Sequence, residues 1–504
     1  MEKLNVPTEV LCGRDVILKN ANKFKTIGTK AFIVSGKHSA LKNGSLDDAL
    51  KALKSEKIEY VLFNEVMANP TIPLVYEGSK KLKENGCDFV IAIGGGSPMD
   101  AAKAIAILAR QDIKESDLFS ASISSDVLPI VCIPTTSGTG SEVTPYSIIT
   151  NDRLETKSTI NSIYTYPTLA FLDGKYTETL GRNTTINTVL DALCHAIEGY
   201  LSKKATAYSK ALSLKAIKMI SKHFKELENN TLSIEARDEL LYASTLAGVV
   251  IASCGTVAVH ILGYSLTYYK DIDHGRANGL LLVEFLRLVQ TKEKVLVEEI
   301  LESLNMSSLD ELDKELNILL GEKETISDSE IEKYAIKASK VEKLKNTIID
   351  LSLEDLKDIL KKSLKGWLSM QNRNIKGTVN ILDLIYYKRF RTVDSPMCVG
   401  CGCEYFVNII LKDSFRKKLK FKTPYHGQLF AYASLTTNMK KLMDDYNFDY
   451  KNVRVDLADW DERFLLSFEQ DNREAQFFCS SKDVKFILEN CVRIPEERKK
   501  NDMK

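Results

Sequence analysis

Over the first 180 residues, short apolar runs alternate with amphipathic stretches. Gly, Ser or Pro bound many of the apolar runs, as is common for buried strands. The predicted strands are Ala31–Ser35, Tyr60–Phe63, Asp88–Ile93, Leu128–Pro134 and Leu169–Leu172. Stretches with helical periodicity, such as Leu46–Ser55 and Val75–Asn85, lie between them. Because strands and helices alternate, we expect an α/β domain over residues 1–180, with a parallel sheet covered by helices on both faces.

After about residue 182 the periodicity becomes helical, with few strand signals. The predicted helices are Thr184–Leu201, Tyr208–Glu228, Ile234–Ala252 and Val257–Tyr268. Residues 290–365 continue as Lys- and Glu-rich amphipathic helices, whose charge runs we interpret as solvated faces. The pattern therefore predicts an all-helical second domain over residues 181–365.

The character of the chain changes again over residues 366–504. This segment holds five of the ten Cys and both Trp. Val453–Leu457, Phe464–Gln470 and Glu474–Cys479 alternate as short antiparallel strands do, whereas Gln428–Tyr446 and the residues from Ser481 to Asn490 look helical. We expect a small α+β extension of unknown role.

Composition argues against partners that are recognised through bulk charge. Among 504 residues, 69 are Lys or Arg and 68 are Asp or Glu, which leaves a net charge of +1. Nucleic-acid and membrane-surface binders are usually far from neutral. Ten Cys are too few for a disulfide scaffold, Met1–Pro7 has no apolar signal segment, and no stretch has the roughly 18 apolar residues of a spanning helix. We expect a cytoplasmic enzyme without nucleic-acid or membrane partners.

Two polar loops follow predicted strands. The first, Gly94-Gly95-Gly96-Ser97-Pro98-Met99-Asp100, is called the glycine loop below. Its glycines permit close backbone approach, and the helix that Pro98 begins would present free N–H groups to an anion. The second, Pro134–Glu142, is called the hydroxyl loop. Together they favour a pyrophosphate and cofactor site, although the glycine loop lacks the G-x-G-x-x-G spacing. The alternatives are a structural turn and a surface loop.

Four side chains in the helical half suit a divalent transition metal. Asp191 and His195 are four residues apart and so share one face of a helix. His260 and His274, two of only six His, follow downstream. One carboxylate and three imidazoles fit Fe(II) or Zn(II), and an open position on the metal would polarise a substrate oxygen. An Asp-x-x-x-His pair is more often an ordinary hydrogen bond, and a lone His is more often a core residue. The prediction therefore rests on the combination with the two loops.

In order and spacing, Gly94–Asp100, Thr135–Glu142, Asp191–Glu198 and Val259–Gly275 resemble the iron-containing (group III) alcohol dehydrogenases, over about residues 5–365. The resemblance implies an N-terminal dinucleotide-binding domain, a helical metal-binding domain, and Asp191, His195, His260 and His274 as ligands of Fe(II) or Zn(II). It implies hydride transfer between NAD(P)H and a small-molecule alcohol or aldehyde, and a homodimer or larger assembly. The cofactor-contacting residues it implies are Asn69, Gly94, Gly95, Gly96, Ser97, Asp100, Thr135, Thr136, Thr139, Ser141 and Lys157.

The sequence departs from the family pattern at two positions. Many members carry a second His four residues after the ligand that matches His260, where this chain has Tyr264. The proton path would then use Tyr264, water or a cofactor ribose hydroxyl. NAD-using members often place an Asp where this chain has Gly36. Without that carboxylate, and with Lys37 and Ser39 nearby, the loop favours NADP(H), with NAD(H) as the alternative.

The extension leaves several readings open. Cys398, Cys401 and Cys403, with Cys479 and Cys491, would form a zinc or iron–sulfur site, a redox-responsive group, or incidental buried thiols. The extension would also suit a docking module for a protein partner. A second enzyme reading, within the wider superfamily that includes glycerol dehydrogenase and dehydroquinate synthase, is disfavoured by the hydroxyl loop and the Asp191/His195 pair.

Overall fold

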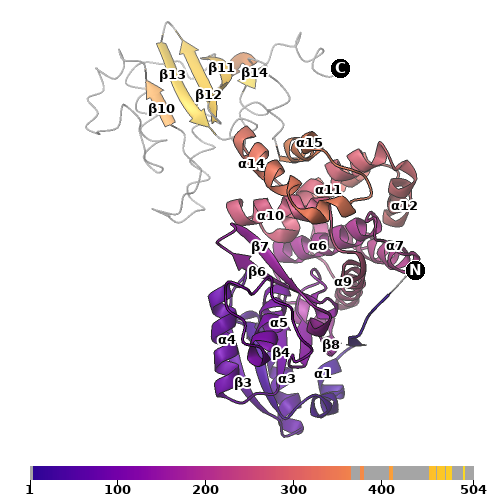
Figure 1. Ribbon diagram of the computed structural model, residues 1–504. Helices are drawn as coiled ribbons and strands as arrows, with labels where there is room; N and C mark the ends of the chain where they lie inside the picture. Colours follow the sequence, from indigo (N-terminus) through magenta and orange to yellow (C-terminus); the bar gives the residue numbers. More distant parts are fainter. Residues whose placement is uncertain are drawn as a thin grey trace, which may run out of the picture. The chain divides into compact units, whose positions relative to one another are not determined.

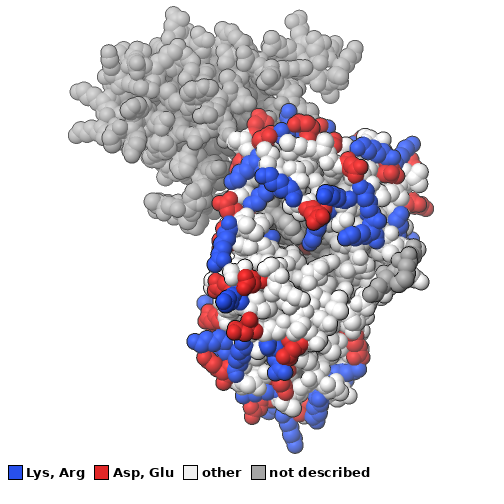
Figure 2. All heavy atoms as spheres, in the orientation of Figure 1, with Lys and Arg blue, Asp and Glu red and all other residues white. Residues whose placement is uncertain are grey.

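The computed structural model describes residues 4–364 and, beyond them, strands between residues 375 and 493. The chain divides into two compact units, Met1–Leu364 and Lys365–Lys504. Figure 2 shows that basic and acidic side chains are interspersed over the face drawn of the first unit, in keeping with the near-zero net charge.

A six-stranded parallel sheet forms the core of residues 4–180, as predicted (Figure 1). Its order is β1-β8-β5-β4-β2-β3. The strands are β1 (Glu9–Cys12), β2 (Lys30–Gly36), β3 (Glu59–Val66), β4 (Phe89–Gly94), β5 (Ile130–Pro134) and β8 (Leu169–Leu172). Every residue of β4 and β5 is buried, which explains their uninterrupted apolar runs, because both faces of a parallel sheet are covered. The sequence pattern missed β1.

Helices cover both faces of this sheet. The α-helices are α1 (Val16–Lys19), α2 (Ser39–Lys42), α3 (Ser45–Ser55), α4 (Ile72–Glu84) and α5 (Gly96–Arg110). Alternate residues of β2 enter two separate cores. Phe32 and Val34 join the core that contains α5, whereas Ala31 and Ile33 join the core that contains α3. Five 3-10 segments complete the connections of the unit: η1 (Ala21–Thr26), η2 (Ser141–Val143), η3 (Ile163–Thr165), η4 (Gly174–Thr177) and η5 (Glu342–Asn346).

The strand order reverses between β2 and β4. The connection after β2 leads outward to β3, whereas the connection after β4 leads to β5 on the opposite side. Ser35 of β2 pairs with Ile93 of β4, so Gly36 and Gly94 leave the sheet side by side. A reversal of this kind opens a crevice at the carboxyl ends of the strands, where nucleotides bind in open α/β sheets.

A two-stranded hairpin, β6 (Tyr146–Asn151) and β7 (Thr156–Asn161), follows the hydroxyl loop. The sequence pattern did not predict it. Figure 1 shows it beside helix α10 (Ala258–Lys270). The base of the hairpin is bound to the α/β part, because Ser147 donates to the Asp100 carbonyl at 2.6 Å. The hairpin thus extends from the sheet towards the helical half.

Residues 182–364 are helical, as predicted, and share one hydrophobic core. The helices are α6 (Arg182–Tyr200), α7 (Ala207–Ser221), α8 (Phe224–Asn229), α9 (Ile234–Cys254), α10 (Ala258–Lys270), α11 (His274–Gln290), α12 (Lys294–Leu304), α13 (Leu309–Leu320), α14 (Asp328–Ser339) and α15 (Leu353–Leu364). The single helix predicted over Tyr208–Glu228 is two helices. They part at buried His223, whose ring contacts Glu226 and Glu239.

The second unit contains an antiparallel sheet of order β10-β13-β12-β11-β9-β14. Its strands are β9 (Ile375–Val379), β10 (Asn408–Leu411), β11 (Val453–Trp460), β12 (Arg463–Gln470), β13 (Arg473–Cys479) and β14 (Val492–Arg493). The three predicted strands are therefore confirmed. The helices predicted over 428–446 and 481–490 lie outside the described residues, as do Cys398, Cys401, Cys403 and Cys491.

Within the described part of the chain, no single helix has the length and apolarity needed to cross a membrane. Helices α9 and α10 meet these criteria only as a pair, and they are bent by 107° where they join.

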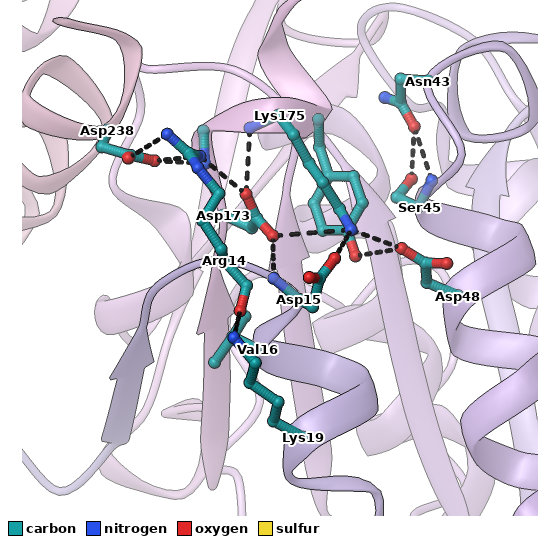
Figure 3. A network of polar contacts seen from close by, with 12 residues as sticks. Arg14, Asp15, Val16, Lys19, Asn43, Ser45, Asp48, Asp173, Lys175 and Asp238 are labelled. Atoms are coloured by element: carbon teal, nitrogen blue, oxygen red, sulfur yellow. Dashed lines mark hydrogen bonds and ion pairs between the residues drawn. The ribbon is translucent and has the colours of Figure 1, made fainter. Parts of the chain in front are cut away.

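A network of buried and half-buried charges joins the first strand's loop to the helical half (Figure 3). Asp173 is fully buried and accepts hydrogen bonds from Arg14 Nη1 at 3.1 Å and from the backbone N–H of Asp15 at 2.7 Å. Arg14 also bonds Asp238 of α9 at 2.8 Å, and Gly174 N–H donates to the same carboxylate. One buried carboxylate therefore helps to fix the sheet against α9.

We expect Asp173→Ala to lower the free energy of unfolding by about 2–3 kcal/mol, because it leaves Arg14 and two N–H donors without their buried acceptor. Urea unfolding followed by circular dichroism measures this. Asp126→Ala, which removes an exposed partner of Arg110, is the matched control and should have a much smaller effect. Equal effects of the two substitutions would contradict the role given to Asp173.

Candidate metal and cofactor site

The glycine loop and the hydroxyl loop lie against each other at the carboxyl ends of β4 and β5. The Thr135 N–H donates to the Gly94 carbonyl at 2.9 Å. A Cβ built on Gly95 would lie 3.0 Å from Thr136 Oγ1, and one on Gly96 would lie 2.7 Å from Thr139 Cγ2. The two loops are therefore so close that side chains at the glycines would collide with the threonines. Helix α5 begins at Gly96, so its free N–H groups lie in this crevice.

Asn69, which the family resemblance implied as a cofactor contact, lies beside the glycine loop. Its N–H donates to Ser97 Oγ at 3.3 Å, and its carbonyl accepts from Thr150 Oγ1 of the hairpin at 3.1 Å. Asn69 has a φ of 59°, a left-handed conformation that Asn tolerates better than most residues. The Asn69 turn therefore links the glycine loop to β6.

Lys103, which the sequence pattern did not single out, binds the hydroxyl loop from α5. It is fully buried in α5, and its Nζ donates to Ser141 Oγ and to the Ser141 carbonyl, both at 2.7 Å, and to the Tyr146 carbonyl at 2.8 Å. Ser141 in turn donates to Asp100 Oδ1 at 2.8 Å. Burial lowers the pKa of Lys103 and raises that of Asp100 to about 6, although each charge favours the other. Spacing offered one signal for this role, because Asp100 and Lys103 are three apart on one helix face.

Three of the four predicted metal ligands form one cluster. Ligand atoms of Asp191, His195 and His260 all lie within 4.8 Å of one another, and all three residues are buried. Asp191 and His195 come from the same face of α6, and His260 comes from the first turn of α10. His274, at the start of α11, lies outside this group of three, but its Nε2 is 3.9 Å from Asp191 Oδ1. The geometry thus brings all three histidines around Asp191.

Hydrogen bonds at the Nδ1 atoms orient two of the imidazoles. His195 Nδ1 lies 3.3 Å from the Gly138 carbonyl, an acceptor only, so Nδ1 carries the proton. His260 Nδ1 contacts the Glu198 carboxylate. His260 Nε2 is buried and has no hydrogen-bond partner. An unpartnered imidazole nitrogen that faces a carboxylate, with the opposite ring nitrogen held by a second acceptor, is the arrangement found at metal centres. The residues therefore fit a divalent metal ion.

Glu198 is the main contributor that the sequence reasoning did not single out. It is fully buried, and its Oε1 accepts from the N–H groups of Val257, Val259 and His260 at 3.1, 2.8 and 3.3 Å. It thus caps the N-terminus of α10 while it orients the His260 ring. The signal was present, because Asp191, His195 and Glu198 have the i, i+4, i+7 spacing of one helix face.

Asn278 supports the other side of the cluster. Its Nδ2 donates to Asp191 Oδ1 at 2.9 Å and lies 3.4 Å from His274 Nε2. The side chain is fully buried in α11, one turn after His274. Helix α11 approaches α6 so closely that a Cβ on Gly275 would overlap the Asn187 carbonyl. Asp191 and His274 are therefore fixed relative to each other by helix packing as well as by Asn278.

The electrostatics of the cluster favour a cation. Burial lowers the pKa of His195 and His274, which keeps these imidazoles neutral and able to bind metal. Burial would also raise the pKa of Asp191, but the surrounding imidazoles hold it well below its usual range. Burial lowers the pKa of His260, but the Glu198 and Asp191 carboxylates together outweigh it and raise the pKa to about 9. Two buried carboxylates in so small a space require positive charge, which a divalent ion supplies.

The remaining predicted residues lie around this cluster and at the reversal of the sheet. The Tyr264 ring stacks on His274, with centroids 5.5 Å apart and planes at 12°. Lys157 is half-buried on β7. Burial lowers the pKa of its ammonium group, and the nearby Asp191 and Asp100 carboxylates partly oppose this. Gly36 ends β2, and Lys37 and Ser39 follow it with exposed side chains. The predicted site residues thus lie in two places, the metal cluster around Asp191 and the crevice at the carboxyl ends of the strands.

Comparisons with known proteins account for most of the first unit. Residues 7–174 match the family model of iron-containing alcohol dehydrogenases, and residues 185–364 match the model of their C-terminal domain. Alcohol dehydrogenase 4 of Schizosaccharomyces pombe is 33% identical over 278 residues, which are 55% of this chain and 66% of that protein. The NADPH-dependent butanol dehydrogenase of Clostridium saccharobutylicum is 33% identical over 291 residues, or 56% and 72% of the two chains. An iron-containing alcohol dehydrogenase structure from Thermotoga maritima is 39% identical, with a TM-score of 0.67 over 72% of this chain and all of that one.

We expect Glu198→Gln to weaken metal binding by about 10- to 100-fold, because a neutral amide orients His260 poorly and removes a buried negative charge. Metal content after dialysis against graded chelator, measured by mass spectrometry, tests this. Glu226→Gln, which alters a carboxylate beside the unrelated His223, is the control. Unchanged metal retention in Glu198→Gln would contradict the orienting role.

Proposed function

The chain belongs to the family of iron-containing alcohol dehydrogenases, and we propose that it transfers a hydride between NADP(H) and an alcohol–aldehyde pair at the centre around Asp191. The observation that carries the proposal is the contact of His195 with Gly138, because it joins a metal-binding cluster to a cofactor-type loop. We propose that residues 1–180 bind the cofactor, that residues 181–365 hold the metal, and that residues 366–504 are an addition outside both matched models.

The cofactor would lie along the crevice where the strand order reverses. The N–H groups at the start of α5 would receive the pyrophosphate, and the adenosine end would extend towards Gly36. Thr135, Thr136 and Thr139 would follow the cofactor towards the metal, with Lys103 and Asp100 holding Ser141 in place. Asn69 and Lys157 would contact it from the hairpin side. In this arrangement the reactive end of the cofactor would lie towards the Gly138 carbonyl, which contacts His195 of the metal cluster.

The metal would be held by Asp191, His195, His260 and His274, and when bound it supplies Lewis-acid polarisation of the substrate oxygen. The family favours iron, and zinc fits the same donor set. Glu198 and Asn278 would keep the ligands in position while charge changes at the substrate. Burial raises the pKa of Tyr264, so its hydroxyl stays protonated. Next to His274, it would donate a hydrogen bond or a proton to the oxygen on which charge develops.

A first experiment tests metal and reaction together. Full-length protein purified without oxygen should carry a divalent metal and oxidise NADPH with at least one member of an aldehyde panel. His260→Ala should lose both the metal and turnover, because it removes a ligand from a buried cluster. His223→Gln, which alters a buried histidine outside the cluster, should keep both. A metal-loaded protein that turns over no aldehyde would contradict the proposed function.

A second experiment tests the preference for NADP(H). We expect Gly36→Asp to move the NADPH/NADH ratio of kcat/KM towards NADH by about tenfold or more, because a carboxylate repels a 2′-phosphate and binds the ribose hydroxyls. The substitution is sterically feasible, since a Cβ would lie 3.3 Å from Ser39 Oγ, which can rotate. Steady-state kinetics with both cofactors measures the ratio, and Gly181→Asp, at a position with open space and ordinary backbone geometry, serves as a control for added charge. An unchanged ratio in Gly36→Asp would contradict this reading of the loop.

A further inference from the structure

The tip of the β6–β7 hairpin is held by a helix of the opposite half of the first unit. Lys337 of α14 donates from Nζ to the Leu154 carbonyl at 3.1 Å and to the Glu155 carbonyl at 2.6 Å. Its third contact is Tyr269 Oη of α10, at 3.0 Å. One ammonium group therefore binds two carbonyls of the hairpin turn and anchors them to two helices.

Tyr269 is held in place by contacts with both the hairpin turn and α14. Its hydroxyl donates to Glu155 Oε2 at 2.8 Å, and its ring stacks on buried Tyr334 with centroids 5.4 Å apart. Lys333 lies over the same ring at 3.8 Å but makes no hydrogen bond to the hairpin within the described residues. Helix α10 also carries His260 and Tyr264, so the hairpin tip is attached to a helix of the metal cluster.

The turn itself is not a self-sufficient structure. Glu155 has a φ of 48°, a left-handed conformation that costs energy for a residue other than glycine. A two-stranded hairpin alone is at best marginally stable in water. The polar sequence Thr156–Asn161 of β7 adds one buried residue, Ile160, to the core. The position of β7 therefore depends on the contacts made by the turn and by the paired strand β6.

Close to the turn, the strand that pairs with Lys157 is tied to the cofactor crevice. Thr150 donates from its N–H to the Pro70 carbonyl at 2.8 Å and from Oγ1 to the Asn69 carbonyl at 3.1 Å. Thr150 is the register partner of Lys157, which lies two residues after Glu155. Two sets of contacts therefore flank Lys157. Its partner Thr150 is bound to the Asn69 turn, and the turn two residues before it is bound to Lys337 and Tyr269.

We propose that Lys337 and Tyr269 are positioning residues for Lys157, and that they fix its ammonium group for contact with the nicotinamide cofactor. The proposal rests on the cofactor-binding role of Lys157 in the proposed function. Lys337 and Tyr269 act by fixing the backbone of Glu155, two residues before Lys157. Loss of the contact would let β7 shift and would weaken cofactor binding while the metal ligands stay in place.

A double-mutant cycle on the full-length protein tests this. NADPH affinity is measured by fluorescence titration, together with steady-state KM and kcat, metal content and melting temperature. We expect Lys337→Met and Tyr269→Phe each to raise the Kd for NADPH roughly three- to tenfold, with aldehyde KM and metal content unchanged. Lys157→Met should raise the Kd about tenfold or more. In the Lys157→Met background, Lys337→Met should have no further effect on Kd, because the group it positions is gone.

The controls separate positioning from general stability. Lys333→Met removes a cation over the same Tyr269 ring and should leave the Kd unchanged, and Lys337→Arg, which keeps the donors, should restore most of the affinity. The proposal is overturned if Lys337→Met and Tyr269→Phe leave the Kd unaltered. It is also overturned if Lys337→Met weakens NADPH binding equally with and without Lys157. Failure of the proposed function would show earlier, as absence of NADPH oxidation by the unaltered protein.

Discussion

The carboxylate of Glu198 is the contact on which the metal cluster depends. Placed on the buried face of α6, it accepts three N–H groups at the start of α10 and contacts the His260 ring. The start of a helix has N–H groups without intrahelical partners, and a buried one needs an acceptor of this kind. The same bonds therefore end the α9–α10 connection, dock α10 on α6 and direct His260 Nε2 towards Asp191. A negative charge buried at this depth also makes a cation favourable nearby.

The second constraint is the close approach of the hydroxyl loop to the helical half. Gly140 has a φ of 59°, and a Cβ there would lie 2.5 Å from the Gly248 Cα of α9. This approach leaves no room for side chains on either glycine. It also places the Gly138 carbonyl within hydrogen-bond distance of His195. Lys103 supports the same loop from α5. The sheet and the helices thus meet at a loop whose backbone is held from both sides, which suits a cofactor that must reach a metal.

The sequence pattern predicted the elements whose burial is uniform along a face or along the whole strand. Strands such as Phe89–Gly94 are buried on both faces and read as uninterrupted apolar runs. Strand β1 was missed because its ends, Glu9 and Cys12, are exposed at the sheet edge, and β7 because its residues are mostly polar. Asp191, His195 and His260 could be proposed from spacing and chemistry. Glu198 and Lys103 act mainly on backbone groups about 40 to 60 residues away along the chain, contacts that only folding reveals.

The two parts of the site are built from elements of different rigidity, and this division has a consequence for catalysis. Asp191, His195 and Glu198 project from one buried helix, where packing leaves each side chain little freedom. The cofactor side consists of the glycine loop, the Asn69 turn and the hairpin, whose turns are held in place by hydrogen bonds. A metal cluster must keep one geometry through turnover, whereas a nicotinamide cofactor must enter and leave. Contacts that tie the turns to the rigid helices, at Gly138 and at Lys337, therefore determine how well the two halves of the reaction are aligned.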